Sequence, residues 1–578
     1  MKFVNKILTR KWTFALVGLS LAVISCDDYL DVDTDTDNST VAPLPLLLAD
    51  ISVSVNNTTD FQFYTGDILQ VYTHQMTVRE EQDQYGARVD NTLINNEWNN
   101  TYLALTNIET LISQATESGD LVYVGIAQMH KAYLMSVAVD LWGDVPFTEA
   151  NKLSEGIVSP VFDNQAAIYA SVFELIDTAK GNIASNEGIL KPGADDLFYK
   201  GDRNRWIRFA NSFKLKLYNQ TRLSTSFDQA GFDALVAEGN FFLNNADDFQ
   251  FVQTANQSPS DERNKLFLSS YNGTQFSTYM SPWFYEILKG VNPAIHTGLA
   301  DPRMPYYFFN QLVPDQFPPD QGNTATGDPR ADYWDASTGF FSIRFGSVGP
   351  WRDSSTENSA TYPGVFPAGG RYDDGLGGRI NDIMAGTVPG VLAPSGVAPH
   401  RIFTYDEFLF TQAELMLVGK LSGDAGAKLN DAILANFAKI DLVVENNGTP
   451  GQLNVPTLAT ANTAAAAFVT AILAEYAAGS DAKKLEIIMT QKWVATFGDP
   501  MDQYNDYRRT GYPVLANPLS TSPEYQLNNN DGFPIVDSQT TLNSPFQVSL
   551  YWPQNELNVN QNAPAQKDAT AYKIFWDN

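Results

Sequence analysis

The chain of 578 residues has very little cysteine and histidine. Cys26 is its only cysteine, which excludes an intrachain disulfide and a zinc cluster built from cysteines. The four histidines, at positions 74, 130, 296 and 400, are too far apart to act as paired metal ligands on one helix. We therefore predict no cofactor, and only a structural calcium ion stays open as an alternative.

Positive charge is also scarce. Lysine and arginine number 37 against 66 acidic residues, which gives a net charge of −29 and a pI near 4.4. Such a surface repels phosphate backbones, so nucleic acid is not an expected partner. Hydrophobic residues make up 44% of the chain, which is ample for large buried cores.

Long apolar runs are missing as well. The run at residues 12–24 has about 13 residues, whereas a membrane-spanning helix needs roughly 20. It follows a basic leader that includes Lys2, Lys6, Arg10 and Lys11, so residues 1–25 are predicted to be a signal peptide. No later stretch reaches about 18 uninterrupted apolar residues, and the mature chain is not expected to span a membrane.

The end of this leader predicts a lipid anchor. The segment Val-Ile-Ser-Cys at 23–26 looks like a lipobox, the bacterial motif after which the cysteine is lipidated and becomes the N-terminus. Two or more acyl chains make a stable anchor, so Cys26 should hold the protein on a membrane. Residues 26–42 form an acidic tether, because their alternating aspartates lack the glycine and glutamate of a calcium loop.

Apolar residues at steps of three and four predict helices in two parts of the chain, 43–244 and 403–515. The clearest stripes lie at 126–141, 166–183, 206–217 and 485–497. Thr404 and Glu407 have the spacing of a capping box at the start of another helix. Helix pairs of roughly 35–50 residues fall in the range of tetratricopeptide-like stacking. The predicted fold is mainly α: a tetratricopeptide-like helical scaffold with a long irregular ligand-binding insertion and a loop-rich C-terminal tail at 516–578.

The insertion, residues 245–402, is rich in Pro, Gly, Asn and Asp, and its one clear helical stripe lies at 283–288. Long ordered loops are usually functional. This segment is also dense in aromatics, and an aromatic ring can cover the apolar face of a sugar while polar neighbours bind its hydroxyls. We predict that exposed aromatics here bind ligand: Trp283, Trp334 and Trp351, followed by Tyr285, Tyr333 and Tyr372. Tyr64, Tyr72 and Tyr85 mark the alternative site.

Motifs of catalysis are missing. No Gly-x-Ser-x-Gly elbow occurs, Glu414 stands where a phosphate-binding loop needs glycine, and the glycines at 375–378 lack the third glycine of a dinucleotide fingerprint. Acidic pairs such as Asp195-Asp196 and Asp373-Asp374 could serve a glycosidase, but a chain with 66 acidic residues contains such pairs by chance. We predict no catalytic residues and no enzymatic activity.

A set of segments spread along the chain has distinctive sequences. It begins with CDDYLD at 26–31 and ends with YWPQNE at 551–556, and it includes DLWGDVPF at 140–147, WIRFANSFKL at 206–215 and RRTGYP at 508–513. Further stretches of the set lie at 132–134, 301–303, 407–414 and 491–493. Together these segments resemble the SusD/RagB family of nutrient-binding outer-membrane lipoproteins, in its SusD-like branch. The matched segments belong to the scaffold, so no ligand residue carries over. Arg508 and Arg509 are expected to pair with carboxylates at a helix end.

The resemblance implies a tetratricopeptide-like scaffold that sits as a lid on a SusC-like TonB-dependent transporter of a Bacteroidota outer membrane, facing the cell exterior. The function it implies is capture of an oligo- or polysaccharide and its delivery to that transporter. A peptide-binding member of the same family is the second reading, because acidic and aromatic pockets also suit basic peptides. A secreted glycoside hydrolase is the third.

Overall fold

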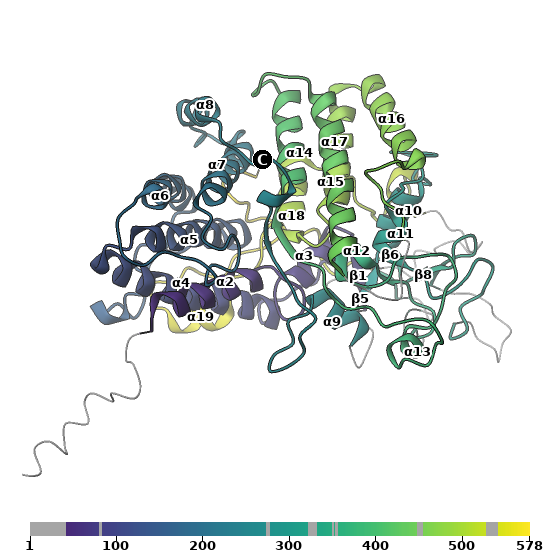
Figure 1. Ribbon diagram of the computed structural model, residues 1–578, viewed down its shortest axis with the longest axis horizontal. Helices are drawn as coiled ribbons and strands as arrows, with labels where there is room; N and C mark the ends of the chain where they lie inside the picture. The colour runs from purple at the N-terminus through teal and green to yellow at the C-terminus, as the bar shows by residue number, and fades with distance from the viewer. Residues whose placement is uncertain are drawn as a thin grey trace, which may run out of the picture.

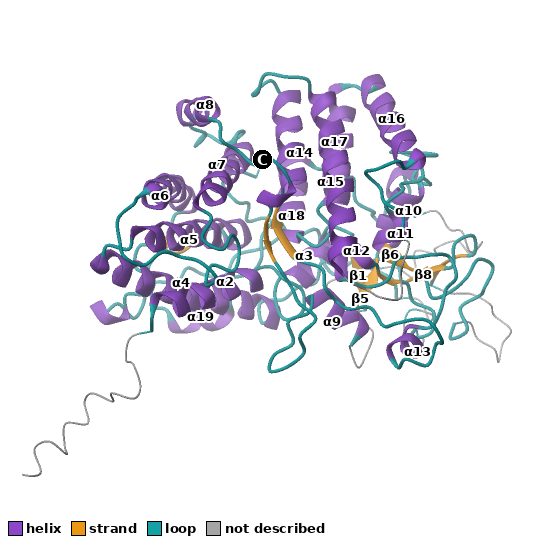
Figure 2. Cartoon of the chain, viewed as in Figure 1, coloured by secondary structure: helices purple, strands orange, loops and turns teal. Residues whose placement is uncertain are grey.

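Helices form most of the regular structure in the computed structural model, as the sequence predicts (Figure 1 and Figure 2). The structure describes residues 42–79, 84–272, 278–321, 332–348, 352, 356–447, 455–527 and 541–577. The helices up to the irregular insertion are α2 (Leu44–Asn57), α3 (Gly66–Tyr72), α4 (Thr92–Ser118), α5 (Leu121–Trp142), α6 (Gln165–Ala184), α7 (Arg203–Thr221) and α8 (Gln229–Glu238).

The insertion carries only short helices, and long ones return after it. Within it lie α9 (Lys265–Tyr271), α10 (Pro282–Lys289), α11 (Met304–Tyr307), α12 (Val365–Ala368) and α13 (Ile380–Met384). After it come α14 (Tyr405–Leu417), α15 (Ala425–Asn447), α16 (Thr463–Ala478), α17 (Asp481–Ala495), α18 (Pro500–Thr510) and α19 (Gln554–Val559). The helices predicted from the stripes at 126–141, 166–183, 206–217, 283–288 and 485–497 are confirmed as α5, α6, α7, α10 and α17. Three-residue 3₁₀ turns are η2 (Leu153–Glu155), η3 (Asn245–Asp247) and η4 (Pro523–Tyr525).

α5 is the central helix of the N-terminal half. It is apolar almost all round and buried over nearly its whole length, packed between α4 and α6. Gly125 permits the close approach of α6, because a Cβ there would lie 2.7 Å from the carbonyl oxygen of Ala179. α5 ends at Gly143, whose φ of +76° favours glycine, as the predicted helix stop requires.

The long helices after the insertion form a second group. α14 packs against α15 and α17, and α16 packs against both α15 and α17. Figure 1 shows α14, α15, α16 and α17 standing side by side, with the short strands and loops of the insertion below and beside them. α18 crosses to the N-terminal half, where it packs against α3 and α7. This crossing joins the two groups of helices.

All paired strands in the described ranges belong to two-stranded antiparallel sheets. The pairs are β1 (Met76–Val78) with β5 (Thr278–Met280), β2 (Val145–Pro146) with β3 (Phe162–Asp163), β4 (Phe249–Phe251) with β10 (His400–Phe403), β6 (Phe308–Phe309) with β9 (Tyr362–Pro363), and β7 (Tyr333–Asp335) with β8 (Phe340–Ser342). β4 and β10 lie at the two ends of the insertion, so their pairing brings its ends together.

The capping box predicted at Thr404 and Glu407 is wrong, although α14 does begin there. The Thr404 side chain makes no capping bond to the helix and instead donates to Asp406 Oδ1 at 2.7 Å. Glu407 is fully buried near Lys216 of α7 and Lys492 of α17. The Glu407 carboxylate therefore faces these two lysines, which are distant in sequence, and not the start of α14 as a capping box requires.

The C-terminal tail contacts α5 and the loop after it. Trp552 Nε1 donates to the Asp144 carbonyl at 2.9 Å, and Trp576 Nε1 donates to Asp140 Oδ1 at 2.9 Å. The tail, which carries the short helix α19, thus covers the end of α5. The predicted signal peptide, Cys26 and all but the last residue of the predicted tether lie outside the described residues. In the part of the chain that is described, no helix has the length and apolar character needed to cross a membrane.

Candidate functional site

Three of the six aromatics predicted to bind ligand belong to the core. Trp283 is 2% exposed, and its indole Nε1 donates to the Val514 carbonyl at 3.0 Å. Tyr285 is fully buried and stacks on Phe340, with ring centroids 3.9 Å apart. Tyr333 is 1% exposed. The expectation that these rings are exposed is wrong, because α10 and the β7–β8 hairpin pack together as part of the main hydrophobic core.

The acidic neighbours of Trp334 also point inward. Tyr285 Oη donates to Asp335 Oδ2 at 2.7 Å, and Ser347 Oγ donates to Asp332 Oδ2 at 2.7 Å. Tyr333 and Asp335 lie on one face of β7 and are buried, because side chains alternate along a strand. Trp334 lies on the other face.

Trp334 and Tyr372 are the two predicted aromatics that remain half-buried. Trp334 packs edge-on against Phe317, with centroids 5.1 Å apart, and its enclosed Nε1 has no hydrogen-bond partner among the described residues. Tyr372 packs against Tyr306 at 4.9 Å. Burial raises the pKa of Tyr372, and the adjacent carboxylates Asp373 and Asp374 raise it further. Both rings therefore keep part of their surface open to solvent.

Asn310 connects the segments that carry these two rings. Its Nδ2 donates to Asp373 Oδ2 at 2.7 Å and lies 3.4 Å from the Thr338 carbonyl, in the turn between β7 and β8. The loop after Tyr372 therefore lies beside the hairpin that bears Trp334. Burial raises the pKa of Asp373 to about 6. The structure thus places the segment that carries Tyr372 beside the hairpin that carries Trp334, and the carboxylate of Asp374 is exposed.

Trp351, the remaining predicted aromatic, lies outside the described residues. At the alternative site, Tyr72 and Tyr85 are buried and Tyr64 is half-buried. Tyr72 Oη donates to Gln547 Oε1 at 2.9 Å, which ties the N-terminal half to the tail. Two of the three alternative tyrosines are therefore core residues.

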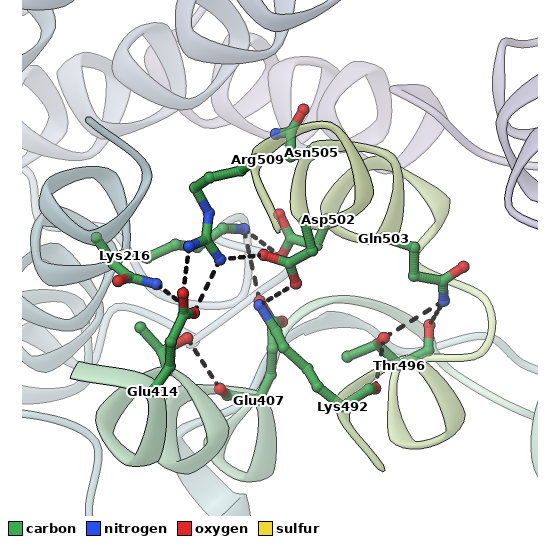
Figure 3. A network of polar contacts seen from close by, with 12 residues as sticks. Lys216, Glu407, Glu414, Lys492, Thr496, Asp502, Gln503, Asn505 and Arg509 are labelled. Atoms are coloured by element: carbon green, nitrogen blue, oxygen red, sulfur yellow. Dashed lines mark hydrogen bonds and ion pairs between the residues drawn. The ribbon is translucent and has the colours of Figure 1, made fainter. Parts of the chain in front are cut away.

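A buried network of charges joins α7, α14, α17 and α18 (Figure 3). Glu414 of α14 accepts from Arg509 of α18 and forms an ion pair with Arg222 at 2.9 Å. Lys492 of α17 lies 2.7 Å from Asp506. Arg509 therefore pairs with carboxylates as predicted.

Arg508 differs from its prediction. Its guanidinium donates to two backbone carbonyls, of Val548 and Asp140, each at 2.8 Å. It holds the tail against the end of α5 rather than binding a carboxylate.

Three acids of this network, Glu407, Asp499 and Asp502, bring carboxylate oxygens within 4.8 Å of one another, a spacing that could hold a metal ion. Two ammonium groups already lie there, since Lys216 pairs with Asp502 and Lys492 lies 3.6 Å from Glu407. Burial and the neighbouring Asp502 raise the pKa values of Glu407 and Asp499 well above normal. Burial alone would raise the pKa of Asp502, but Lys216, a hydrogen bond with Glu407 and Lys492 together outweigh it and lower that pKa to about 2. The ion pairs of this cluster join α7, α14, α17 and α18.

The sequence contained no indication of a cavity of about 480 Å³ that lies between α4 and α19. Its lining comes from three segments far apart in the chain: part of α4, the β2–β3 connection and the end of α19. No local pattern in the sequence could have joined them.

Comparisons with known proteins agree with this architecture. A family model named SusD-like and described as "Starch-binding associating with outer membrane" matches residues 36–332 and 354–535. A SusD homolog from Bacteroides fragilis superposes with a TM-score of 0.63 at 16% identity, over 93% of this chain and 99% of its own. No curated protein matches the chain.

Two further solved structures share the fold. A SusD/RagB family protein from Bacteroides thetaiotaomicron has a TM-score of 0.60 at 20% identity, over 90% of this chain and 95% of its own. A chitin-binding SusD homolog from Flavobacterium johnsoniae has a TM-score of 0.59 at 19% identity, over 92% and 98% of the two chains. At such identities the likeness shows the fold alone.

Proposed function

The chain belongs to the SusD-like family of starch-binding proteins that associate with the outer membrane, and from that premise we propose that it captures a glycan at the cell surface and delivers it to a TonB-dependent transporter. The family match along most of the chain is the observation that carries the proposal. Solved relatives that include a chitin-binding protein support a saccharide as ligand. The family's association with the outer membrane supports a transporter of that membrane as partner.

The proposed anchor is a lipidated Cys26. The basic leader, the short apolar run and the single cysteine coincide in position, and the acidic residues after Cys26 suit a solvated tether on the outer face. Mass spectrometry of the mature N-terminus should find an acylated cysteine. An unmodified Cys26, or a Cys26→Ala protein that stays on the membrane, would contradict the anchor.

The proposed glycan contacts are Trp334 and Tyr372, beside the carboxylate of Asp374. Fully covering one aromatic face contributes about 1.5–3 kcal/mol, whereas association costs at least about 4 kcal/mol. Two or three such contacts with a few hydrogen bonds give a dissociation constant on the order of micromolar to millimolar. Weak binding suits a protein that must release its ligand to a transporter.

We propose binding without turnover. The acidic pair at 195–196, which could have served a glycosidase, is used in the fold: Asp196 is buried and accepts from Trp206 Nε1 at 2.7 Å, and Asp195 accepts from Tyr123 Oη at 2.8 Å. Asp373 is held by Asn310. Neither pair is free to flank a glycosidic bond across a sugar.

Two experiments test the proposal. The full chain, solubilised in mild detergent, should bind members of a glycan array and leave a peptide library unbound, and it should release no product from any bound polysaccharide. Binding confined to peptides, or product release abolished by one carboxylate substitution, would refute it. A pull-down from native membranes should recover an outer-membrane barrel in near-equal amount, and repeated recovery of the protein alone would refute the transporter partnership.

A further inference from the structure

A groove runs between α4 and α19, at the opposite end of the molecule from the β7–β8 hairpin (Figure 1). Its volume of about 480 Å³ lies within the range of small-molecule sites, about 300–1,000 Å³, and is too small for a folded partner. We name it the α4–α19 groove. Its lining residues are Trp98, Asn99, Tyr102, Leu103, Thr106, Pro146, Ala150, Asn151, Val158, Pro160, Glu556, Val559 and Asn560.

Trp98 supplies a hydrogen-bond donor without a partner. The residue is 5% exposed and is held by aromatic neighbours, with Tyr102 at 4.8 Å and Trp142 at 5.0 Å between ring centroids. Its indole Nε1 makes no hydrogen bond to any described residue, yet it is not enclosed like the unpartnered Nε1 of Trp142. The residual exposure of Trp98 therefore includes this N–H, and Trp98 is one of the residues that line the groove. A ligand acceptor placed there would satisfy a donor that the fold leaves unused.

The other polar groups that line the groove include side-chain amides and one carboxylate. The amide of Asn99 is exposed and makes no hydrogen bond within the described part of the chain. Glu556 is the single charged residue of the lining, and one of its oxygens accepts from Asn560 at 2.9 Å. An indole donor, amides and a carboxylate acceptor together match hydroxyl groups, which both donate and accept.

Apolar surface completes the groove. Leu103, Val158 and Val559 are 67%, 74% and 73% exposed, and they line the groove together with the rings of Trp98 and Tyr102. Sugar rings combine apolar C–H faces with hydroxyl edges, as this lining requires. A lipid chain fits less well, because it would leave the Trp98 N–H and the Glu556 carboxylate unpaired in a dry site.

We propose that the α4–α19 groove is a second saccharide site, which holds one or two neutral sugar units through the Trp98 N–H, the Asn99 amide and the Glu556 carboxylate. The class of ligand rests on the proposed function, whereas the site is separate from the Trp334 and Tyr372 surface. A long glycan could be held at both ends of the molecule.

The test is calorimetric titration of the full chain with three disaccharides: diacetylchitobiose, maltose and cellobiose. Wild type should bind at least one of them with millimolar or tighter affinity. Trp98→Phe keeps a ring and removes the N–H, and Asn99→Ala removes an exposed amide without internal partners. Each should weaken that binding about fivefold or more.

Trp142→Phe is the matched control, because it removes an enclosed, unpartnered N–H from the same aromatic cluster. It should leave disaccharide binding within about twofold of wild type. Equal weakening by Trp142→Phe and Trp98→Phe would assign the effect to packing and overturn the proposal. So would unchanged binding in both Trp98→Phe and Asn99→Ala, or no disaccharide binding in wild type. If wild type then still bound longer glycans through Trp334, the proposed function would stand while the groove site failed.

Discussion

Trp283 and Trp334 were equal candidates in the sequence, and the structure places them in different environments. Trp283 is 2% exposed and donates a hydrogen bond to the Val514 carbonyl, so Trp283→Ala should leave a cavity and an unpaired acceptor. Truncating a buried tryptophan to alanine costs about 3–5 kcal/mol. The thermal midpoint should therefore fall by several degrees.

Trp334→Ala should behave differently, because this ring is half-buried and its Nε1 makes no hydrogen bond to a described residue. Its loss should cost about 1–2 kcal/mol, mainly from the contact with Phe317. If Trp334 covers a sugar face, the same change should weaken oligosaccharide binding about tenfold. Trp283→Phe, which keeps part of the ring, should fall between wild type and Trp283→Ala in stability and should bind glycan normally.

Thermal unfolding followed by circular dichroism, together with titration calorimetry on each variant, separates the two effects. An unchanged midpoint for Trp283→Ala combined with lost binding would show that Trp283 faces ligand and would refute this assignment. A large drop in midpoint for Trp334→Ala without any change in binding would make Trp334 a core residue too.

Two further predictions concern buried charges. Glu414→Gln should destabilise the protein by about 3–5 kcal/mol in urea unfolding, because it leaves the guanidinium groups of Arg509 and Arg222 buried without the negative charge that pairs with them. The control Glu109→Gln, in a surface ion pair with Lys131, should change stability by less than about 1 kcal/mol. Equal effects of the two changes would contradict the stabilising role of the buried network. Burial raises the pKa values of Asp60 and Glu97 to about 7, so at these two positions the native state holds more protons than the unfolded chain, and each position makes the protein less stable as the pH rises from about 5 to 8. The buried His74, His130 and His400, whose pKa values are lowered by burial, act in the opposite direction. Urea unfolding at both pH values should show that Glu97→Gln loses less stability, or gains more, than wild type over this range, and an equal change in both proteins would exclude Glu97 as a contributor.

Helices that bury one face against a neighbour could be predicted from the sequence, because apolar residues on a buried helix face recur at intervals of three and four positions. α7 and α17 are of this kind. The prediction of a capping box at Glu407 was wrong because the Glu407 carboxylate lies beside Lys216 and Lys492 instead. These lysines are nearly 200 residues before Glu407 and 85 residues after it in the chain. A local motif gives no information about such distant partners.

The site was harder to predict than the fold. Loop-like composition in the insertion suggested exposed rings, but its short strands close over α10 and bury Tyr285 against Phe340 and Tyr333 against Glu286. The unpartnered indole of Trp98 could not be found at all, because the groove it lines is completed by Val158 and Glu556 from distant parts of the chain.

The central claim is that this protein captures glycans, and titration calorimetry of the full chain with a panel of oligosaccharides of increasing length tests it most directly. The account predicts binding of at least one glycan with a dissociation constant on the order of micromolar to millimolar, weakened about tenfold by Trp334→Ala. No heat of binding with any glycan, in a protein that binds peptides under the same conditions, would contradict it.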